Sequence, residues 1–353
     1  MELNRFGWDS FFENNNIESP VPPLAFARVA EQHKNKYLLF SEQGEISGEL
    51  SGKILHHVAL DSLPTVGDWV AILPVPNESK GIIQYLLPRK NAIERKSAGL
   101  LTTHQALAAN IDTLLIVSGL DFDFNLRRIE RYLTMAYNCG VSPVIALNKS
   151  DLCDDPQSRL LEVEAIAPAI PVALLSAMNN IGLENIRPFL SYAKTVALVG
   201  SSGVGKSSII NTLYGRPILE IGEVRADDSR GRHTTTYRQM ILLPDGAILI
   251  DTPGLRELQL WGDDDGLKST FDDIDRFARQ CRFSDCRHDS EPDCAVKSAL
   301  ENGELEPGRY ESYLKLQREL KYLKMRQKMK PNAVEKLRWK SISKIQRKFS
   351  EDS

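Results

Sequence analysis

Apolar positions are spaced differently in successive parts of the chain. Residues 1–23 are largely polar and are expected to form a loose lead-in, whereas from residue 24 to residue 105 short apolar runs recur between turn-forming glycines and prolines. The expected strands include residues 37–40, 53–55, 68–73 and 81–85. Short strands without a convincing helix predict a small β-barrel or sandwich. A five-stranded OB-type barrel fits this length, although the pattern alone does not separate it from an SH3-like barrel.

The pattern changes between residues 106 and 262. Apolar runs at residues 113–117, 144–147, 172–175 and 195–199 alternate with helical patterns at residues 126–137, 159–166 and 207–213. Continuous apolar runs separated by helices predict a parallel sheet covered on both faces. Two further runs, at residues 239–243 and 247–250, flank Pro244-Asp245-Gly246, which is a hairpin-type turn. We therefore expect an α/β domain here, within a multidomain α/β protein.

Residues 263–353 combine a cluster of cysteines and histidine with strongly charged helical patterns at residues 309–330 and 333–348. From residue 315 onwards there are 13 Lys and Arg against four acidic residues, so this tail carries +9 and the other 314 residues carry −12. A basic tail on an acidic body is typical of contact with a polyanion, and a solvated helix face is the alternative. We expect a helical zinc-binding domain with a basic helical tail.

Composition limits the class of protein. The 353 residues are 42% hydrophobic and 26% charged, as in a soluble globular protein of two or three domains. The longest uncharged stretch, residues 165–183, is interrupted by Pro168 and Pro171, which excludes a membrane span. The polar N-terminus does not resemble a secretory signal, and five cysteines argue for reduced thiols or a metal. These features predict a cytoplasmic protein.

A glycine-rich sequence follows the apolar run at residues 195–199 and opens the next helical pattern. It matches G-x-x-x-x-G-K-[ST] and consists of Gly200, Ser201, Ser202, Gly203, Val204, Gly205, Lys206 and Ser207, with Ser208 next in the expected helix. Glycines let backbone N–H groups surround phosphates, and the helix N-terminus adds its positive end. We expect Lys206 to reach the β- and γ-phosphates and the Ser207 hydroxyl to bind Mg²⁺.

Two further segments fit a triphosphate site. Asp251-Thr252-Pro253-Gly254 follows an apolar strand, so Asp251 can hold Mg²⁺ and the Gly254 N–H can bind the γ-phosphate. A polar segment, Gly231-Arg232-His233-Thr234-Thr235-Thr236, lies between Ser207 and Asp251. Thr235 is the preferred candidate for the magnesium shell, with Thr234 second and a plain strand start as the alternative.

The base-binding candidates precede the phosphate loop. Asn148-Lys149-Ser150-Asp151 follows the expected strand at residues 144–147, and Ser176-Ala177 follows the one at residues 172–175. The Asp151 carboxylate can accept two hydrogen bonds from guanine, and adenine lacks that pair of donors. Asn148 would support the loop, Lys149 would pack on the base, and Ala177 suits a backbone contact to the guanine oxygen. Together with the phosphate loop, these motifs predict GTP.

Three thiols and one imidazole lie within 14 residues at Cys281, Cys286, His288 and Cys294. A Cys₃His set is typical of closed, structural Zn²⁺ sites, and the surrounding loop is too polar to fold without a metal. A catalytic zinc and unligated cysteines are the alternatives. Cys139 and Cys153 are expected to be packing residues.

Basic and aromatic residues supply candidate RNA contacts. In the tail, Lys and Arg can neutralise phosphates, and interleaved aromatics can stack on bases or pack on protein. The barrel can add an oligonucleotide-binding face. The candidate barrel contacts are His33, Lys34, Lys36, Arg89, Lys90, Arg95 and Lys96.

The order of the motifs is unusual, because the base-binding motifs of GTPases normally follow the phosphate loop. A circular permutation explains this order. The barrel-like N-terminus, the order N-K-S-D, S-A, G-S-S-G-V-G-K-S, G-R-H-T-T-T, D-T-P-G and the cysteine cluster together resemble the ribosome small subunit-dependent GTPase family, RsgA. The resemblance covers residues 24 to 330, nearly the whole chain.

The resemblance implies an OB-fold domain, a permuted GTPase domain and a C-terminal zinc domain. It also implies GTP hydrolysis that is stimulated by the small (30S) ribosomal subunit and coupled to its late maturation. The expected partners are that subunit, its rRNA and GTP or GDP with Mg²⁺, and the expected protein is a monomer that binds no membrane. The alternatives are a translation-factor-type GTPase and an RNA-binding protein with a vestigial nucleotide site.

The expected catalytic residues are Lys206, Thr235 and His233. Leu255 follows Gly254 where Ras-like enzymes carry the glutamine that orients the attacking water. His233 is the nearest polar candidate for this role, and the resemblance points to the same histidine. Capping or packing of the segment is its alternative role.

Overall fold

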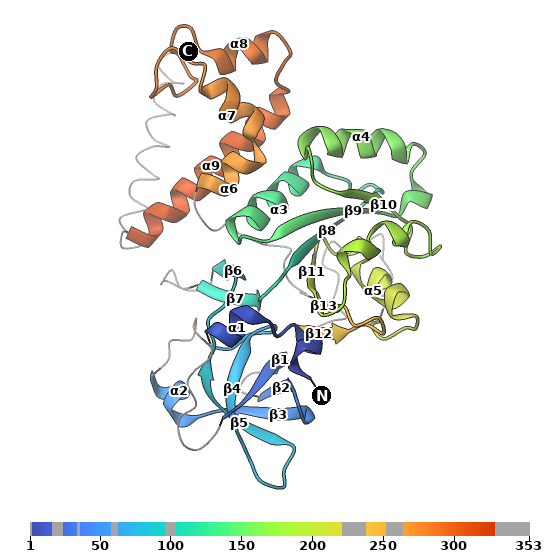
Figure 1. The fold of residues 1–353 in the computed structure, drawn as a ribbon. Helices are drawn as coiled ribbons and strands as arrows, with labels where there is room; N and C mark the ends of the chain where they lie inside the picture. The colour runs from blue at the N-terminus through green and yellow to red at the C-terminus, as the bar shows by residue number, and fades with distance from the viewer. Residues whose placement is uncertain are drawn as a thin grey trace, which may run out of the picture. The chain divides into compact units, whose positions relative to one another are not determined.

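Figure 1 shows a computed structural model of the chain, which describes residues 2–15, 24–33, 36–57, 63–96, 104–220, 238–251 and 264–328. The described residues form two compact units, one drawn from residues 1–94 and 105–258 and the other from residues 95–104 and 259–353. Within the described ranges, no helix has the length and apolar character needed to cross a membrane.

The N-terminal segment is ordered, in contrast to the expected loose lead-in. It forms a short 3₁₀ helix, η1 (Leu3–Phe6), and the helix α1 (Ser10–Asn14), which the Asp9 side chain caps by accepting from the Phe11 N–H at 3.1 Å. Phe6 and Phe12 are almost fully buried in the core. Burial of these aromatic side chains therefore orders a segment that was expected to be loose because most of its residues are polar.

A closed five-stranded barrel follows. Its strands are β1 (Ala25–His33), β2 (Lys36–Ser41), β3 (Gly44–Leu50), β4 (Trp69–Pro74) and β5 (Lys80–Leu86). They pair in the order β1-β2-β3-β5-β4, β4 closes onto β1, and β3 and β5 are parallel. Together with a helix between β3 and β4, this is the arrangement of the OB fold, which the sequence alone did not separate from an SH3-like barrel.

The helix between β3 and β4 corrects one prediction. Residues 53–55, expected to be a strand, lie in α2 (Gly52–His57). Ser51 Oγ accepts from the Ile54 N–H at 3.5 Å at the start of this helix, and Ile54 packs into the barrel core. Three apolar residues look alike in a strand and in a helix, so the periodicity could not separate the two.

The strands β8 to β13 form the predicted α/β layer of the first unit. A separate two-stranded sheet consists of β6 (Ala92–Lys96) and β7 (His104–Ala109). The α/β strands are β8 (Thr113–Gly119), β9 (Ser142–Asn148), β10 (Val172–Leu174), β11 (Thr195–Val199), β12 (Gln239–Leu242) and β13 (Ile248–Asp251). Their order is β10-β9-β8-β11-β13-β12, and all are parallel except β12. The predicted hairpin is therefore confirmed as β12–β13.

Helices cover both faces of this sheet, as its continuous apolar strands require. The helices α3 (Leu126–Asn138) and α4 (Pro156–Ile166) pack on one face, and α5 (Lys206–Tyr214) packs on the other with short 3₁₀ turns, as Figure 1 shows. These turns are η4 (Leu183–Asn185) and η5 (Arg187–Phe189), and a third turn, η3 (Ser150–Leu152), follows β9. A bridge between Glu31 of β1 and Gln239 of β12 joins barrel and layer into one 11-stranded sheet.

The second unit contains four described helices around its own core. They are α6 (Asp264–Thr270), α7 (Asp272–Ala278), α8 (Ala295–Glu301) and α9 (Pro307–Lys328). The almost fully buried Arg309 donates to both carboxylate oxygens of Asp273, at 2.6 and 2.8 Å, and so ties the start of α9 to α7. The helical pattern expected at residues 333–348 lies outside the described residues.

Candidate functional site

Loops that follow the parallel strands meet at one edge of the sheet. The loops after β8, β9, β10 and β11 and the end of β13 all lie at the carboxyl edge, which is where α/β sheets bind ligands. The phosphate loop lies between β11 and α5, and the base-binding motifs follow β9 and β10. The permuted chain thus brings its motifs to one edge despite their order in the sequence.

Two glycines of the phosphate loop occupy positions that no other residue could take without strain. Gly200 and Gly205 have φ values of +150° and +97°. A Cβ would lie 2.2 Å from the carbonyl oxygen of Val117 at Gly200, and 2.1 Å from the Asn148 Nδ2 at Gly205. The loop therefore packs tightly on the neighbouring strands, and its backbone conformation depends on glycine.

Lys206 lies across the phosphate loop. Its Nζ donates to the carbonyl oxygens of Gly200 at 2.8 Å and Ser201 at 2.6 Å. Asp251 is 4% exposed at the end of β13, and its Cα pairs with that of Leu198 in β11, just before the loop. The cationic Lys206 and the carboxylate of Asp251 therefore lie at the ends of adjacent strands, and their roles toward phosphates and a divalent metal stay predictions.

Asn148 connects the phosphate loop to the base-binding loops. Its Nδ2 donates to the Val204 carbonyl oxygen at 2.8 Å, and its Oδ1 accepts from the Ala177 N–H at 3.0 Å. In addition, Thr212 Oγ1 of α5 donates to the Ala177 carbonyl oxygen at 3.0 Å. These bonds bring the three predicted motifs together within one hydrogen-bonded unit.

Lys149 and Asp151 lie in the turn that follows β9. Lys149 has the left-handed φ of 63°, and its Nζ contacts Asp121 Oδ2 at 2.5 Å. Asp151 is exposed within η3, whereas Ser176 is 1% exposed next to Ala177. The ion pair with Asp121 holds the Lys149 side chain in place. The Asp151 carboxylate is exposed and is therefore accessible to a ligand.

Two charged residues of this edge were not predicted. Asp121 follows β8, and Arg128 of α3 donates to the Ser201 hydroxyl of the phosphate loop. Both residues could have been found from the sequence, because they follow an expected strand. Polar residues that follow a parallel strand lie at the ligand-binding edge of the sheet. By contrast, His233, Thr235 and Gly254 lie outside the described residues, so their predicted roles stay predictions.

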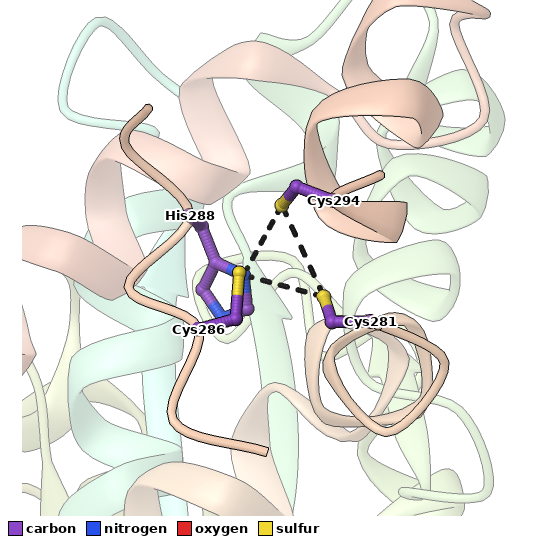
Figure 2. A group of neighbouring side chains, drawn as sticks. All are labelled: Cys281, Cys286, His288 and Cys294. Atoms are coloured by element: carbon purple, nitrogen blue, oxygen red, sulfur yellow. Dashed lines mark hydrogen bonds between the residues drawn. The ribbon is translucent and has the colours of Figure 1, made fainter. Parts of the chain in front are cut away.

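The predicted zinc ligands lie close together in the second unit. Figure 2 shows Cys281, Cys286, His288 and Cys294 pointing toward one another, and their ligand atoms all lie within 4.8 Å of each other. The Sγ atoms of Cys281 and Cys294 are 3.9 Å apart, and the His288 Nδ1 lies 3.6 and 3.4 Å from them.

These separations fit a tetrahedral zinc site. With Zn–S near 2.3 Å and Zn–N near 2.0 Å, tetrahedral geometry places two sulfurs about 3.8 Å apart and a sulfur about 3.5 Å from the nitrogen. Partial burial lowers the pKa of His288, which favours the neutral imidazole that a metal binds, although the Glu291 carboxylate opposes this shift. The donor set and its geometry therefore fit one structural Zn²⁺.

The Glu291 carboxylate organises the loop between the zinc-ligand candidates. It accepts from the N–H groups of Arg287 at 3.0 Å, Asp289 at 3.0 Å and Ser290 at 3.2 Å. These bonds lower the pKa of Glu291 to about 2, with the Arg287 N–H as the largest contribution. A single side chain therefore shapes the backbone on both sides of His288.

The other two cysteines pack against the core of the first unit, as predicted. Burial raises the pKa of Cys139 to about 12, so this thiol stays protonated and unreactive. Cys153 is half-buried against the same core.

Several candidate RNA contacts of the barrel have partners within the protein. Arg89 donates to both oxygens of the buried Asp68 at 2.7 Å, and Lys90 forms an ion pair with Asp9. His33 lies 2.9 Å from Glu31. Lys36 is exposed, whereas Lys34 and the side chains of Arg95 and Lys96 lie outside the described part of the chain. Arg89 therefore contributes to barrel stability, and Lys36 keeps an exposed charge.

Comparisons with known proteins agree with this arrangement. The family model described as RsgA GTPase matches residues 86–261. A protein of Opitutus terrae named Small ribosomal subunit biogenesis GTPase RsgA is 44% identical over 357 residues, covering 98% of this chain and 97% of that protein. The protein of Oceanobacillus iheyensis named Small ribosomal subunit biogenesis GTPase RsgA 1 is 45% identical, and 99% of each chain is covered.

Two solved structures share the fold. The crystal structure of YjeQ from Thermotoga maritima matches with a TM-score of 0.61 at 30% identity, covering 84% of this chain and 98% of that chain. The structure of YloQ, described as a circularly permuted GTPase, matches with a TM-score of 0.59 at 22% identity, covering 85% and 96%. The likeness to YloQ supports the permuted fold.

Proposed function

The chain belongs to the RsgA GTPase family, and from this premise we propose that it hydrolyses GTP to GDP and phosphate on the small (30S) ribosomal subunit and couples this reaction to late maturation of the subunit. One observation carries the nucleotide part of the proposal: Asn148 joins the phosphate loop to the base-binding loop through hydrogen bonds of 2.8 and 3.0 Å. The names of the full-length relatives support the ribosomal part.

Each described motif takes one role in this proposal. Lys206 and the N–H groups of residues 200–208 bind the phosphates, Asp151 reads the guanine edge, and Ala177 contacts the guanine oxygen through its backbone. Ser207, Asp251 and Thr235 would hold Mg²⁺, which neutralises phosphate charge when bound. The intact set supports an enzyme over a protein with a vestigial site.

We assign the orientation of the attacking water to His233. A neutral imidazole can accept a hydrogen bond from water without removing its proton, and Leu255 cannot. Replacing His233 by Ala should leave GTP affinity within a few-fold but remove most of the hydrolysis stimulated by small subunits. Stimulated hydrolysis at the wild-type rate in this variant would exclude the assignment.

The remaining parts of the proposal concern partners and organisation. One Zn²⁺ per chain holds the second unit together, and that unit, its basic tail and the barrel contact rRNA. We keep the expected domain boundaries near residues 23, 105 and 262. A monomeric protein that works on ribosomal subunits belongs in the cytoplasm.

The decisive experiment measures GTP hydrolysis with and without purified small subunits. The proposal expects slow turnover alone, strong stimulation by small subunits, and weaker stimulation by assembled ribosomes. Lys206→Ala should abolish turnover in both conditions because the phosphates lose their lysine. Equal stimulation by assembled ribosomes would favour a translation-factor role instead, and turnover that persists in the Lys206 variant would contradict the site.

A further inference from the structure

An arginine outside the known nucleotide motifs contacts the phosphate loop. The Nη1 of Arg128 donates to the Ser201 hydroxyl, to Asp123 Oδ2 at 2.5 Å and to the Asp123 carbonyl oxygen at 3.3 Å. The Arg128 side chain is 34% exposed, so its guanidinium lies at the surface of the loop and not within the core. Ser201 is also the residue whose carbonyl oxygen accepts from Lys206. Two cationic side chains therefore meet at one residue of the phosphate loop.

The position of Arg128 is fixed by the start of α3. The Asn125 side chain caps this helix and accepts from the Arg128 N–H at 3.1 Å. Asp123, which holds the guanidinium, is itself tied to the preceding loop, where its N–H donates to Asp121 Oδ1 at 3.1 Å. Both the backbone and the head of Arg128 are thus held before any ligand binds, which lowers the entropic cost of using this side chain.

Arg128 keeps hydrogen-bond donors available. A guanidinium has five N–H donors, and within the described part of the chain every side-chain hydrogen bond of Arg128 is donated by Nη1. Its Nε and Nη2 therefore have no protein acceptor among the described residues. The planar fork of an arginine fits phosphate oxygens well.

The strand order places Arg128 beside the phosphate loop, because β8, which leads into α3, pairs directly with β11, which leads into that loop. The base-binding loops follow β9 and β10, whereas Asp251 ends β13 on the other side of β11. A triphosphate that runs from the base to a metal near Asp251 must cross the phosphate loop, and α3 lies on the face opposite α5. Arg128 therefore approaches from the side that the N-terminus of α5 does not cover.

We propose that Arg128 is a built-in arginine of the hydrolysis reaction: its free donors contact the terminal phosphate and stabilise the charge that develops there in the transition state. This inference rests on the proposed function. Arginines that act in this way in other GTPases contribute about 10³–10⁵ in kcat. Asp123 and Ser201 act as positioning residues, because they hold the guanidinium in place.

The test compares Arg128→Ala with Arg159→Ala, which removes an exposed arginine of α4 that pairs with Glu162 and stacks on Phe124. Arg128→Ala should bind GDP within about twofold of wild type but hydrolyse saturating GTP at least tenfold more slowly, both alone and with small subunits. Arg128→Lys should stay well below the wild-type rate, because an ammonium lacks the planar fork that presents separate nitrogens to Asp123 and Ser201 and to a phosphate. Arg159→Ala should match the wild type in both measurements.

Two results would overturn the inference: a rate for Arg128→Ala within twofold of wild type, or an equal loss of GDP and GTP affinity with an unchanged saturated rate, which indicates a loop scaffold only. Ser201→Ala provides a second variant, with an expected smaller loss of rate, and an unchanged rate there would remove Ser201 from the positioning role. Failure of the wild type to hydrolyse GTP in a Lys206-dependent manner would instead overturn the proposed function.

Discussion

Asn148 holds two loops of the nucleotide site through a single amide. Its nitrogen donates to the Val204 carbonyl oxygen and its oxygen accepts from the Ala177 N–H. An amide supplies one donor and one acceptor group, whereas a carboxylate of the same shape would leave the Val204 carbonyl without a donor. The phosphate and base loops are therefore fixed relative to each other before nucleotide binds, which reduces the ordering cost of binding.

Base selection should depend on the exposed Asp151. Asp151→Asn should shift the preference from guanosine to xanthosine nucleotides, because xanthine presents a carbonyl where guanine has its amine, and the new amide can donate to it. Competition binding of GDP and xanthosine diphosphate to the variant measures this directly. Unchanged selectivity for GDP would remove Asp151 from base recognition.

The ion pair between Asp121 and Lys149 should also affect nucleotide affinity. Its atoms are 2.5 Å apart, and the side chains are 12% and 20% exposed, so the pair is shielded from solvent more than most surface pairs. Asp121→Asn should weaken GDP and GTP binding equally, by about three- to tenfold, because the lysine stem loses its fixed position.

Asp154→Asn is the matched control for this pair, because Asp154 is an exposed acid on the same edge of the sheet. It should leave both affinities unchanged. Equal affinities in the two variants would show that the ion pair does not position Lys149. An equal effect on GDP and GTP also distinguishes Asp121 from Arg128, whose replacement should affect the reaction of GTP.

At the scale of elements, the periodicity of the chain predicted the α/β layer well and the N-terminal region less well. Buried parallel strands are continuous apolar runs, so β8 to β11 could be located from the sequence. The six residues of α2 and the segment with Phe6 and Phe12 depend on tertiary packing, which no local pattern contains.

In the candidate site, too, features within one short segment could be predicted, whereas contacts between distant segments could not. Motifs within one loop, such as residues 200–207, could be predicted because their functional residues are neighbours in the sequence. The partners of those motifs could not, since Lys149 meets Asp121 across 28 positions and Arg128 meets Ser201 across 73. Such pairs depend on the order of strands in the sheet, which spacing alone does not reveal.

The zinc loop should depend on its metal. The described loop between Cys281 and Cys294 is mostly polar and exposed, and its backbone is held by Glu291 and by the ion pair of Arg282 with Asp293. Cys286→Ala should therefore lose zinc and loosen the second unit, while nucleotide affinity stays near wild type. Metal analysis of freshly purified protein should find about one zinc per chain in the wild type and in the control Cys153→Ala. Absence of zinc from the wild type would contradict the prediction.

At the scale of the first unit, β1 belongs to both the barrel and the α/β layer. Residues 25–28 of β1 pair with β4, and Glu31 pairs with Gln239 of β12 on the same edge. A register shift between Val29 and Glu31 separates the two pairings. A bulge bends a strand and changes the direction of its edge. The first half of β1 can therefore pair with β4, and the second half with β12.

Arg28 strengthens the same junction. It is 1% exposed and donates to the carbonyl oxygens of Gly67 at 3.1 Å, Asn110 at 3.0 Å and Phe6. Burial lowers the pKa of Arg28 to about 10, which still leaves it charged at neutral pH. The N-terminal segment, the barrel and the start of the α/β layer are therefore held by one buried cation.

This continuity predicts that the barrel responds to the nucleotide. The hairpin of β12 and β13 lies between residues 221–237, which contain His233 and Thr235, and residues 252–263, which contain Gly254. A change in either segment on loss of the γ-phosphate can reach the hairpin along the chain, and the pair of Glu31 and Gln239 connects β12 to β1. Amide hydrogen exchange should therefore differ between protein bound to a non-hydrolysable GTP analogue and protein bound to GDP, in β12 and in the second half of β1. The strand β3, which pairs with β2 and β5 away from the junction, is the internal control and should exchange at the same rate in both states.

If β12 changes while β1 does not, the barrel is attached to the GTPase layer without sensing its nucleotide, and subunit binding through the barrel cannot be the route by which hydrolysis is stimulated.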